Sequence, residues 1–545
     1  MRELRPIQSE QVDAVVTGFR RHPSQLLISP TGTGKTVIIT SIVDKARAGN
    51  VLVLAHREEL VMQLWQTMTD AGIDVGIEMN TKTTLDQGLL SRPRVVVASV
   101  ASITSGSRLE HVVTNPDHWS LTVIDEAHHA AAKSYRKILA HMFKNSSHKL
   151  LGVTATPDRM DKRSLLEIFD TVSHEYTLKQ AMDDGYLVPI KYRVVEVKSI
   201  DLDQVRSTAG DLNKLEVSRI MGQEKHLHAV AEPTRELAAG KRAVIFCVSV
   251  DQATRLAEIL NRAEPDSAVA VSGLTPADER QISFQQFSEG KIRYLCNCMI
   301  ATEGWDCPEC EVVVLARPTK SRALYAQMVG RGLRPLPDVL SSAGGSDGER
   351  RAAIASSDKP ECLVLDFVGN CSKHRLANAF DLIEPDSGPR LNRAKRIAAT
   401  KDEAVDLEDC LEEADESLEE DARQLERERE ERRAVVRARV DFGSTVVDPF
   451  AVLDMDAPTL PSEDEALATD RQCDFLSKWK VDARFMRKSD ATKLQREIFR
   501  RQKHGLCTIA QCRILKAYGV QDTEITKAKA SELIDYYING GKQSV

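Results

Sequence analysis

The chain has 545 residues, of which 42% are hydrophobic, and its 74 Lys and Arg against 81 Asp and Glu give a formal net charge of −7. This length exceeds what one hydrophobic core sustains and predicts about three or four domains. Because no apolar run reaches roughly 18 residues and the first residues lack the apolar stretch of a signal peptide, we expect neither a membrane span nor secretion; 11 Cys fit free thiols in the cytoplasm.

The first predicted elements are an amphipathic helix over residues 10–21, a strand at 26–28 and a helix that begins near residue 35. The turn between strand and helix, residues 29–36, reads Ser-Pro-Thr-Gly-Thr-Gly-Lys-Thr. A glycine-rich turn at a helix N-terminus directs backbone N–H groups toward a phosphate. Ser29 replaces the first Gly of the usual G-x-x-x-x-G-K-[ST] pattern, so a surface turn with a chance Gly-Lys-Thr is the alternative.

This phosphate-binding turn predicts a site for ATP and Mg²⁺. Lys35 would contact the β- and γ-phosphates, and the Thr36 hydroxyl would ligate Mg²⁺. Gln8 carries an amide that can both donate to and accept from an adenine edge. The other residues expected to bind the nucleotide here are Thr31, Gly32, Thr33 and Gly34.

Short apolar runs then alternate with helical stretches. Continuous apolar strands separated by helices are typical of a parallel sheet covered on both faces, whose ligands bind at the carboxyl ends of the strands. Asp125 and Glu126 follow one such strand, where Asp125 would hold Mg²⁺ and Glu126 would orient the attacking water. An acidic pair at a helix N-terminus is the alternative. The strands are expected at residues 51–55, 94–99, 121–124 and 149–154.

A second series of strands follows residue 230 and has no phosphate-binding turn of its own. Arg331 and Arg334 lie three apart on a predicted helix and would point two cations in one direction. Across a cleft from Lys35 they could neutralise charge that develops on the γ-phosphate; a basic helix face is the alternative. Residues 337–360, rich in Ser, Gly and Ala, predict a flexible loop. The strands are expected at residues 243–248, 268–272, 292–295, 311–316 and 362–366.

Four cysteines of this second series lie close together in the sequence. Their spacing makes a zinc site conceivable. However, Cys296 and Cys298 share one face of a predicted strand, and free Cys is a common small core residue, so core packing is favoured. The four are Cys296, Cys298, Cys307 and Cys310.

The order of these motifs resembles that of superfamily 2 helicases of the DEAD/DEAH-box type. Within the superfamily, residues 1–385 look most like the RadD-like branch in the group of XPB-like and type III restriction helicases. The resemblance rests on GTGKT at residues 32–36, DEAH at 125–128, TATP at 154–157 and QMVGRGLR at 327–334. It implies an α/β fold with two tandem RecA-like parallel-sheet lobes that hold ATP between them.

The resemblance also assigns roles that the residues alone do not. His56, Arg57 and Ser99 of the first lobe and Thr302 of the second would contact the nucleic-acid strand, and Gly304 and Asp306 would sense the nucleotide. The implied activity is that of an ATP-dependent DNA helicase or translocase in DNA repair, recombination, replication or phage-related DNA processing. Its partner would be single-stranded, duplex or branched DNA. A nucleic-acid remodeller that ATP switches without unwinding, and an RNA helicase, stay open as alternatives.

Charge is distributed unevenly after the second series of strands. Residues 402–421 contain twelve acidic and no basic side chains, whereas residues 466–545 contain sixteen basic and nine acidic ones. Leucines recur about every 3.5 positions in the acidic tract and predict a charged spacer helix, with a short coiled coil as the alternative. Residues 443–465 contain three Pro and read as a linker.

The last residues contain an internal repeat with an offset of 39 positions, in which Thr469 and Gln472 recur as Thr508 and Gln511. Each Thr is expected to cap a helix, so the repeat predicts two helix-turn-helix units packed as a small bundle. We expect this basic bundle to bind nucleic acid. The alternative is that it docks a single-strand-binding protein or another protein. The side chains that could follow phosphates are Arg484, Arg487, Lys488, Arg500 and Arg501.

The predicted domains can now be stated in order. They are an ATP-binding RecA-like lobe at residues 1–190, a connector at 191–230, a second RecA-like lobe at 231–385, an acidic helix with a flexible linker at 386–465, and a small all-α basic domain at 466–545.

Overall fold

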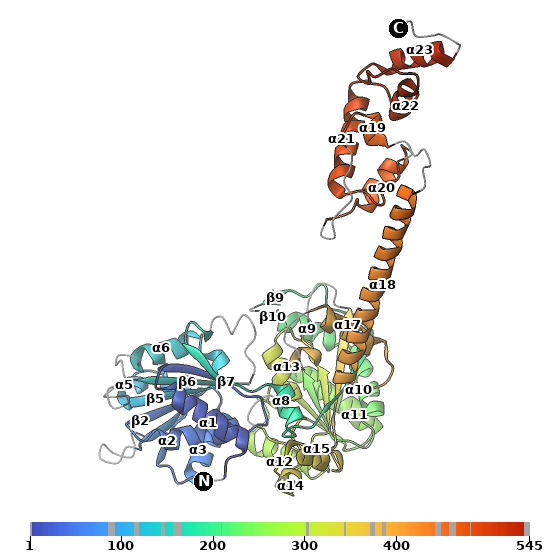
Figure 1. The fold of residues 1–545 in the computed structure, drawn as a ribbon. Coiled ribbons are helices and arrows are strands. Elements are labelled where there is room, and N and C mark those ends of the chain that lie inside the picture. Colours follow the sequence, from blue (N-terminus) through green and yellow to red (C-terminus); the bar gives the residue numbers. More distant parts are fainter. Residues whose placement is uncertain are drawn as a thin grey trace. The chain divides into compact units, whose positions relative to one another are not determined.

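We describe a computed structural model of the chain, which divides into two compact units, residues 1–416 and residues 417–545 (Figure 1). Each unit is described by itself. The residues that the structure describes are 3–84, 93–113, 119–142, 148–155, 165–208, 210–300, 305–342, 345–370, 376–383, 388–441, 448–456, 465–479 and 481–538.

The first lobe of unit 1 is built on a seven-stranded sheet in the order β3-β4-β2-β5-β6-β1-β7, in which every pair of neighbours is parallel. Its inner strands are almost wholly buried because helices cover both faces. The strands are β1 (Ser24–Ile28), β2 (Asn50–Ala55), β3 (Val75–Glu78), β4 (Val95–Ser99), β5 (Trp119–Asp125), β6 (Lys149–Thr154) and β7 (Thr171–Glu175). The helical segments are α1 (Pro6–Gly18), α2 (Lys35–Lys45), α3 (Glu58–Asp70), α4 (Val100–Ile103), α5 (Arg108–Val112), η3 (Ala127–His129) and α6 (Lys133–Met142).

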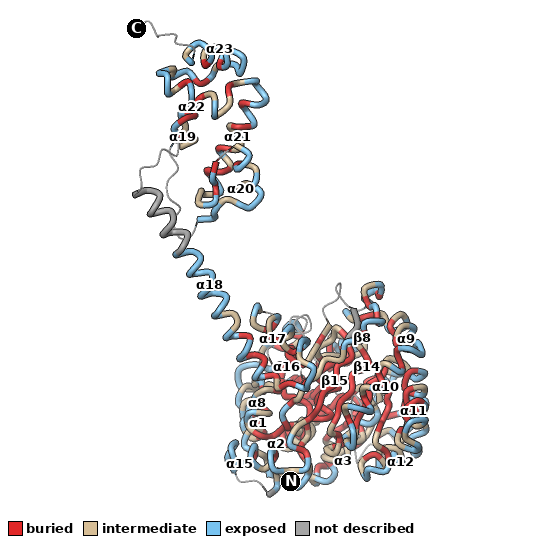
Figure 2. The backbone as a smooth tube through the Cα atoms, turned by 90° about the vertical axis from the view of Figure 1, so that its right-hand side faces the viewer, coloured by how far each residue is buried: buried red, intermediate tan, exposed pale blue. Residues whose placement is uncertain are grey.

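The second lobe has another seven-stranded sheet, in the order β12-β13-β11-β14-β15-β8-β16, whose strands are parallel except for the short edge strand β16. Its central strands β14 and β15 are buried (Figure 2). The strands are β8 (Ile190–Asp201), β11 (Ala243–Cys247), β12 (Ala268–Ser272), β13 (Tyr294–Cys298), β14 (Val312–Ala316), β15 (Cys362–Asn370) and β16 (Val405–Asp406), with a hairpin of β9 (Ser207–Thr208) and β10 (Asp211–Leu212). The helices are α8 (Leu178–Asp183), α9 (Lys214–Met221), α10 (Glu224–Leu237), α11 (Val250–Ala263), α12 (Ala277–Ser288), α13 (Arg322–Val329), α14 (Pro337–Ser342), α15 (Asp347–Ala355), α16 (Phe380–Ile383) and α17 (Pro389–Thr400). The predicted architecture of two tandem parallel-sheet lobes is confirmed.

Two segments differ from the expectation. Residues 191–230, predicted as a connector, contain β8, which pairs with β15 along most of its length, so the second sheet begins inside that segment. Residues 337–360, predicted as a flexible loop, form α14 and α15. Ser346 accepts a hydrogen bond from the backbone N–H of Glu349 and its own backbone N–H donates back to the Glu349 carboxylate, so the serine that suggested a loop caps a helix.

The clustered cysteines are core residues, as predicted. Cys296 on β13 packs into the apolar cluster on one side of the second sheet. Cys307 and Cys310 pack into the cluster on the other side, together with Cys362. Within the described residues, no three His, Cys, Asp or Glu side chains form a group that could hold a metal ion.

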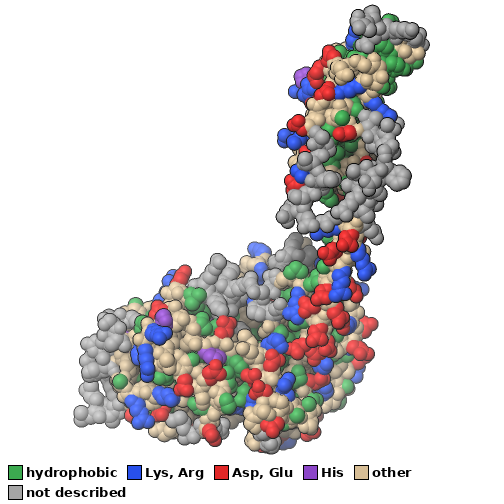
Figure 3. Space-filling view, viewed as in Figure 1, with side chains coloured by type: hydrophobic (Ala, Val, Ile, Leu, Met, Phe, Trp, Pro, Cys, Tyr) green, Lys and Arg blue, Asp and Glu red, His purple; other side chains and the backbone are tan. Residues whose placement is uncertain are grey.

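The acidic tract forms the long helix α18 (Leu407–Asp441), as its apolar spacing predicted. Its first turns are not a free spacer, because Leu407, Leu411 and Ala414 are buried in the core of the second lobe. Leu391 and Ala394 of α17 join the same core. Acidic side chains gather over the start of α18 on the surface (Figure 3).

Unit 2 carries the sequence repeat as a structural repeat. The Thr469–Gln472 and Thr508–Gln511 pairs each form a capping box, and each Gln side chain also donates to a residue of the following helix. The linker expected at residues 443–465 instead contributes Phe450 to the core of this unit. The helices are α19 (Pro449–Val452), α20 (Asp470–Ser477), α21 (Lys488–Lys503), α22 (Ile509–Ala517) and α23 (Lys527–Ile538). No helix among the described residues combines the length and apolarity needed to cross a bilayer.

Candidate nucleotide-binding site

The phosphate-binding turn joins the buried strand β1 to α2. Gly32 and Gly34 have φ values of 91° and 89°, a conformation that other residues avoid. Gly34 is also the N-cap of α2 and supplies no side-chain hydrogen bond, so the first N–H groups of this helix have no side-chain cap. An uncapped helix N-terminus next to a glycine-rich turn is an anion-binding site.

Ser29, which departs from the usual pattern, supports the turn from within. Its side chain is fully buried, and its Oγ lies 2.8 Å from the Oγ1 of Thr33. Thr33 in turn donates from Oγ1 to the carbonyl of Pro30 at 2.7 Å. These hydroxyls hold the turn in shape, and the Ser29 substitution therefore leaves the fold of the turn intact.

Gln8 contacts the turn directly. Its Nε2 donates to the carbonyl of Thr33 at 2.9 Å, and its Oε1 accepts from the backbone N–H of Arg5 at 3.0 Å. A Cβ on Gly34 would lie 2.5 Å from this Nε2, and the φ of 89° already disfavours any residue other than glycine here. The predicted adenine-reading residue thus also ties α1 to the phosphate-binding turn.

The acidic pair at the end of β5 contacts this turn: Asp125 is the last residue of the strand and Glu126 follows it. Lys35 forms an ion pair with Glu126, with Nζ 3.1 Å from Oε1. Glu126 has a φ of 49°, the left-handed region, and its backbone N–H donates to the Asp125 carboxylate at 3.0 Å. Burial raises the pKa of Asp125, and the adjacent Glu126 carboxylate raises it further. The Lys35 ammonium acts in the opposite direction and lowers the pKa of Asp125 in part.

The second lobe contributes two arginines that follow α13. Arg331 is buried, and its guanidinium donates to the carbonyl of Trp305. Arg334 forms an ion pair with Asp306. The arginine segment also packs directly against the phosphate-binding turn, since a Cβ on Gly330 would lie 1.9 Å from the Oγ1 of Thr31.

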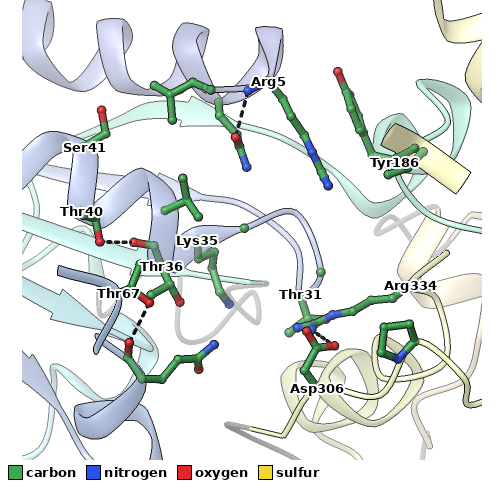
Figure 4. A pocket seen from close by; sticks show the side chains of 18 of the residues that line it. Arg5, Thr31, Lys35, Thr36, Thr40, Ser41, Thr67, Tyr186, Asp306 and Arg334 are labelled. Carbon is green, nitrogen blue, oxygen red and sulfur yellow. Dashed lines mark hydrogen bonds and ion pairs between the residues drawn. The ribbon is translucent and has the colours of Figure 1, made fainter. Parts of the chain in front are cut away.

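One cavity of about 940 Å³ collects these side chains (Figure 4). Thr31, Lys35 and Arg334 face it from two lobes, and Thr33 alone of the predicted turn residues lies outside its wall. The predicted residues that line it are Gln8, Thr31, Gly32, Gly34, Lys35, Thr36, Asp125, Glu126, Asp306, Arg331 and Arg334.

Two further residues of the wall were not predicted from the sequence. Arg5 and Tyr186 both line the cavity, and the guanidinium carbon of Arg5 lies 5.3 Å from the centre of the Tyr186 ring. Arg350 contacts the same ring at 4.3 Å. No local motif marks this group, because α1, α8 and α15 bring its members together only in the folded protein.

Lys359 is a buried side chain that connects two segments of the second-lobe wall. It is 1% exposed, and its Nζ donates to the carbonyl of Pro308 at 2.6 Å and to that of Arg334 at 2.7 Å. Burial lowers the pKa of this ammonium group. The side chain therefore joins the end of the arginine segment to the segment that carries Asp306.

Three of the residues expected to contact nucleic acid lie at the carboxyl ends of the paired strands β2 and β4, where Ala55, just before His56, is the register partner of Ser99. Arg57 donates from Nη1 to the carbonyl of Met299 in the second lobe at 2.6 Å, and Met299 has the unusual φ of 66°. Ser99 is buried at the end of β4, and the His56 ring lies 4.4 Å from that of His129. Their predicted roles stay predictions. Thr302, Gly304 and the second half of the TATP segment lie outside the described residues.

Two protein families match the sequence. The family described as "Type III restriction enzyme, res subunit" matches residues 1–159, which carry the phosphate-binding turn and the acidic pair. The family "Helicase conserved C-terminal domain" matches residues 225–335, which end just after the arginine pair. The two matches therefore cover both walls of the cavity.

Several known proteins are similar in sequence to this chain. IRC3 of Saccharomyces cerevisiae, provisionally named an ATP-dependent helicase, is 33% identical over 393 residues, 68% of this chain and 52% of IRC3. A 51.5 kDa protein of a Lactococcus phage is 30% identical over 311 residues, 57% of this chain and 62% of that protein. The DNA 3'-5' helicase XPB of Kineococcus radiotolerans is 27% identical over 349 residues, 62% of this chain and 58% of that helicase. The chain thus spans between about half and two thirds of each of these relatives.

Proposed function

The chain belongs to helicase superfamily 2, in the group that includes XPB and the type III restriction enzymes, and from this membership we propose that it is an ATP-driven motor on DNA. The observation that carries the proposal is the cavity whose walls come from both lobes. ATP hydrolysis there would be coupled to movement on DNA or to its unwinding. DNA repair, recombination, replication and phage-related DNA processing are the settings we propose.

The first lobe would bind and position the triphosphate. The uncapped N-terminus of α2 and the glycine turn fit the phosphates, and Lys35 would exchange its Glu126 partner for a phosphate oxygen. Glu126, once released, would accept a hydrogen bond from the attacking water. Thr36 and Asp125 fit a Mg²⁺ ion, which when bound would screen the phosphate charge.

The second lobe would complete the reaction site. Arg331 and Arg334 are held by a carbonyl and a carboxylate of their own lobe, and either contact can be exchanged for the γ-phosphate. Planar guanidinium groups suit a phosphoryl group because they donate in pairs. Release of phosphate would free both arginines again, so the contact between the lobes would weaken once per ATP. Contacts of each lobe with the strand would then alternate.

The decisive experiment compares substrates on one preparation of the full chain. ATP hydrolysis is measured with single-stranded DNA, duplex DNA, forked DNA and RNA of equal length at one salt concentration, because salt alone shifts such binding by about a thousandfold. The Glu126→Gln variant is the control, since it keeps the size of the side chain and loses the carboxylate. We expect stimulation by DNA and none in the variant.

Two assays of movement follow on the same samples. Displacement of streptavidin from a biotinylated strand reports translocation, and separation of a fluorescent fork reports unwinding. Stimulation by RNA alone contradicts the choice of DNA. Stimulation by DNA without either movement identifies a remodeller that ATP switches between binding states.

A further inference from the structure

The first half of the repeat in unit 2 places a half-buried ring, Phe475, which packs against the core of the unit, next to an exposed ring, Phe499. Phe475 on α20 and Phe499 on α21 have their ring centres 5.0 Å apart, with an angle of 30° between the planes. Phe499 is 55% exposed, although core positions for large apolar side chains exist in the same unit. An exposed ring of this kind offers a flat face to solvent.

The charged neighbours of these rings on the helix surface are all basic. Residues three or four positions away lie beside a helical side chain. For Phe475 the charged neighbours are Arg471 and Lys478, and for Phe499 they are Arg496 and Lys503; all four are exposed. None of the four has an ion pair or a side-chain hydrogen bond with another described residue.

The second half of the repeat does not carry this group of side chains; its own aromatic group is different, with the rings of Tyr518 and Tyr537 stacked 5.3 Å apart. Its capping box and its buried core positions match those of the first half. At five of the six equivalent outer positions, 39 residues later, the basic and aromatic side chains are absent; the sixth, Lys542, lies outside the described residues. The five positions hold Ala510 for Arg471, Ile514 for Phe475, Ala517 for Lys478, Asp535 for Arg496 and Ile538 for Phe499.

Four of the five basic residues that the sequence had suggested form ion pairs within the unit. Arg484 pairs with Asp482, and Arg487 with Glu465. Arg500 pairs with Glu497 and Glu524. Arg501 is 3% exposed, and its Nη1 donates to the carbonyl of Thr523 inside the unit. Of that group, Lys488 is exposed and has no such partner among the described residues.

We propose that Phe475 and Phe499, with Arg471, Lys478, Arg496 and Lys503, form a binding surface for single-stranded DNA. Bases stack on exposed aromatic rings whatever their sequence, and unpaired cations beside the rings meet the phosphates. An acidic peptide carries the same charge, but an apolar peptide side chain needs a hollow to enter, whereas Phe499 projects outward. The proposal rests on the proposed function only for the choice of DNA over RNA.

The test uses the full chain without ATP, so that the lobes stay in one state. Binding of a fluorescent oligo-dT is measured by anisotropy at several salt concentrations for the parent, for Phe499→Ala and for the matched Ile538→Ala. We expect affinity to fall roughly tenfold in Phe499→Ala and to change little in Ile538→Ala. In the double variant Arg496→Gln, Lys503→Gln the salt slope should decrease by about 0.7 for each phosphate that is no longer neutralised.

A second readout locates the binding surface. An oligo-dT that carries 5-iododeoxyuridine is crosslinked by light, and the modified peptides are identified; we expect crosslinks at Phe475 or Phe499. Crosslinks confined to residues 1–416, with unchanged affinity and salt slope in all variants, overturn the proposal. Loss of binding to an acidic, Phe-containing peptide in Phe499→Ala, with DNA binding intact, overturns it in favour of a peptide site. Absence of ATP hydrolysis contradicts the proposed function and leaves this surface standing.

Discussion

The two lobes share one strand order but differ at the sixth position of the sheet. In the first lobe this is β1, which ends at Ile28 and turns through Gly32 and Gly34 into the uncapped N-terminus of α2. In the second lobe it is β8, which runs for 12 residues and continues toward the hairpin β9–β10. Each sheet offers the carboxyl ends of its strands, and the glycines with the uncapped helix are the reason we propose that the first lobe binds the phosphates.

Within its described residues, the second lobe has no such glycine-rich turn, and it contributes two arginines to the cavity. Arg331 and Arg334 follow α13 and face the cavity, while the corresponding wall of the first lobe carries the turn and the acidic pair. The lobes are therefore complementary: backbone donors and one lysine on the first, two arginines on the second. Four predictions test this division of work.

The largest effect is expected for Lys35→Ala. This change removes the one cation that the phosphate-binding turn supplies, so ATP hydrolysis should fall by at least about 10³-fold. Phosphate release at saturating ATP measures it. Lys45→Ala, at the exposed end of the same helix, is the matched control. Turnover that survives in Lys35→Ala would show that the second lobe binds the phosphates unaided.

Arg334→Ala tests the second lobe. Loss of the guanidinium should lower turnover by about 10²–10³-fold, because charge on the γ-phosphate loses a partner during transfer. ATP affinity, measured with a fluorescent analogue, should change far less. Arg351→Ala, an exposed arginine of the same lobe, is the control. An equal loss of ATP affinity and turnover would mean that Arg334 binds ATP in the ground state and does not stabilise the transfer of the γ-phosphate separately.

Asp366→Asn tests a difference between the cores of the two lobes. The strands β6 and β15 hold the same place in the two sheets, but β6 has no acidic residue, whereas β15 carries the buried Asp366. Burial raises the pKa of Asp366 from 3.8 to about 6, although the hydroxyls of Tyr192 and Tyr325 donate to it. Its folded-state pKa is raised, so its stabilising contribution is full below pH 3.8 and is lost as the pH rises through 6.

The parent should therefore lose about 2–3 kcal/mol of unfolding free energy relative to Asp366→Asn between pH 4 and pH 7. Urea midpoints of both proteins across this range measure the difference. The exposed Asp251→Asn should show no such trend. If the difference in unfolding free energy between the parent and Asp366→Asn stays constant from pH 4 to pH 7, the raised pKa of Asp366 is contradicted.

Lys359→Met should have the smallest effect. The stem stays buried, but the carbonyls of Pro308 and Arg334 lose their donor, so the arginine segment shifts and turnover should fall about tenfold. The Michaelis constant for ATP should stay close to that of the parent. Lys291→Met, with its exposed side chain, is the control. Unchanged turnover would show that α13 and its neighbours position the arginines alone.

The sequence was informative where chemistry lies within a few consecutive residues. The glycine-rich turn, the acidic pair at the end of β5 and the helical repeat with its Thr caps were all predicted from short windows. The two parallel sheets followed from the alternation of apolar strands with helices. Each of these features depends on local backbone preference or on hydrophobic period, which neighbouring residues determine.

Composition misled where a segment gained its structure from distant partners. Residues 337–360 look like a loop, yet α15 forms because Arg350 and Ile354 are buried against other parts of the lobe. Phe450, inside the expected linker, finds a core in unit 2. Five basic residues of the repeat looked alike in sequence, and only their neighbours in space distinguish the paired ones from Lys488.

The sequence by itself determined the parallel α/β class of both lobes, most of the central strands, the glycine-rich turn, the catalytic candidates and the repeat, because these follow from local spacing; it missed β3, β7, β8 and β16. The tertiary structure alone decided that Arg5 and Tyr186 share the cavity wall, that Lys359 contacts the carbonyl of Arg334, and that Phe475 and Phe499 lie together beside cations that have no ion pair with another described residue. Such contacts join residues far apart in the chain, and their energy depends on burial and distance, which the order of the residues does not state.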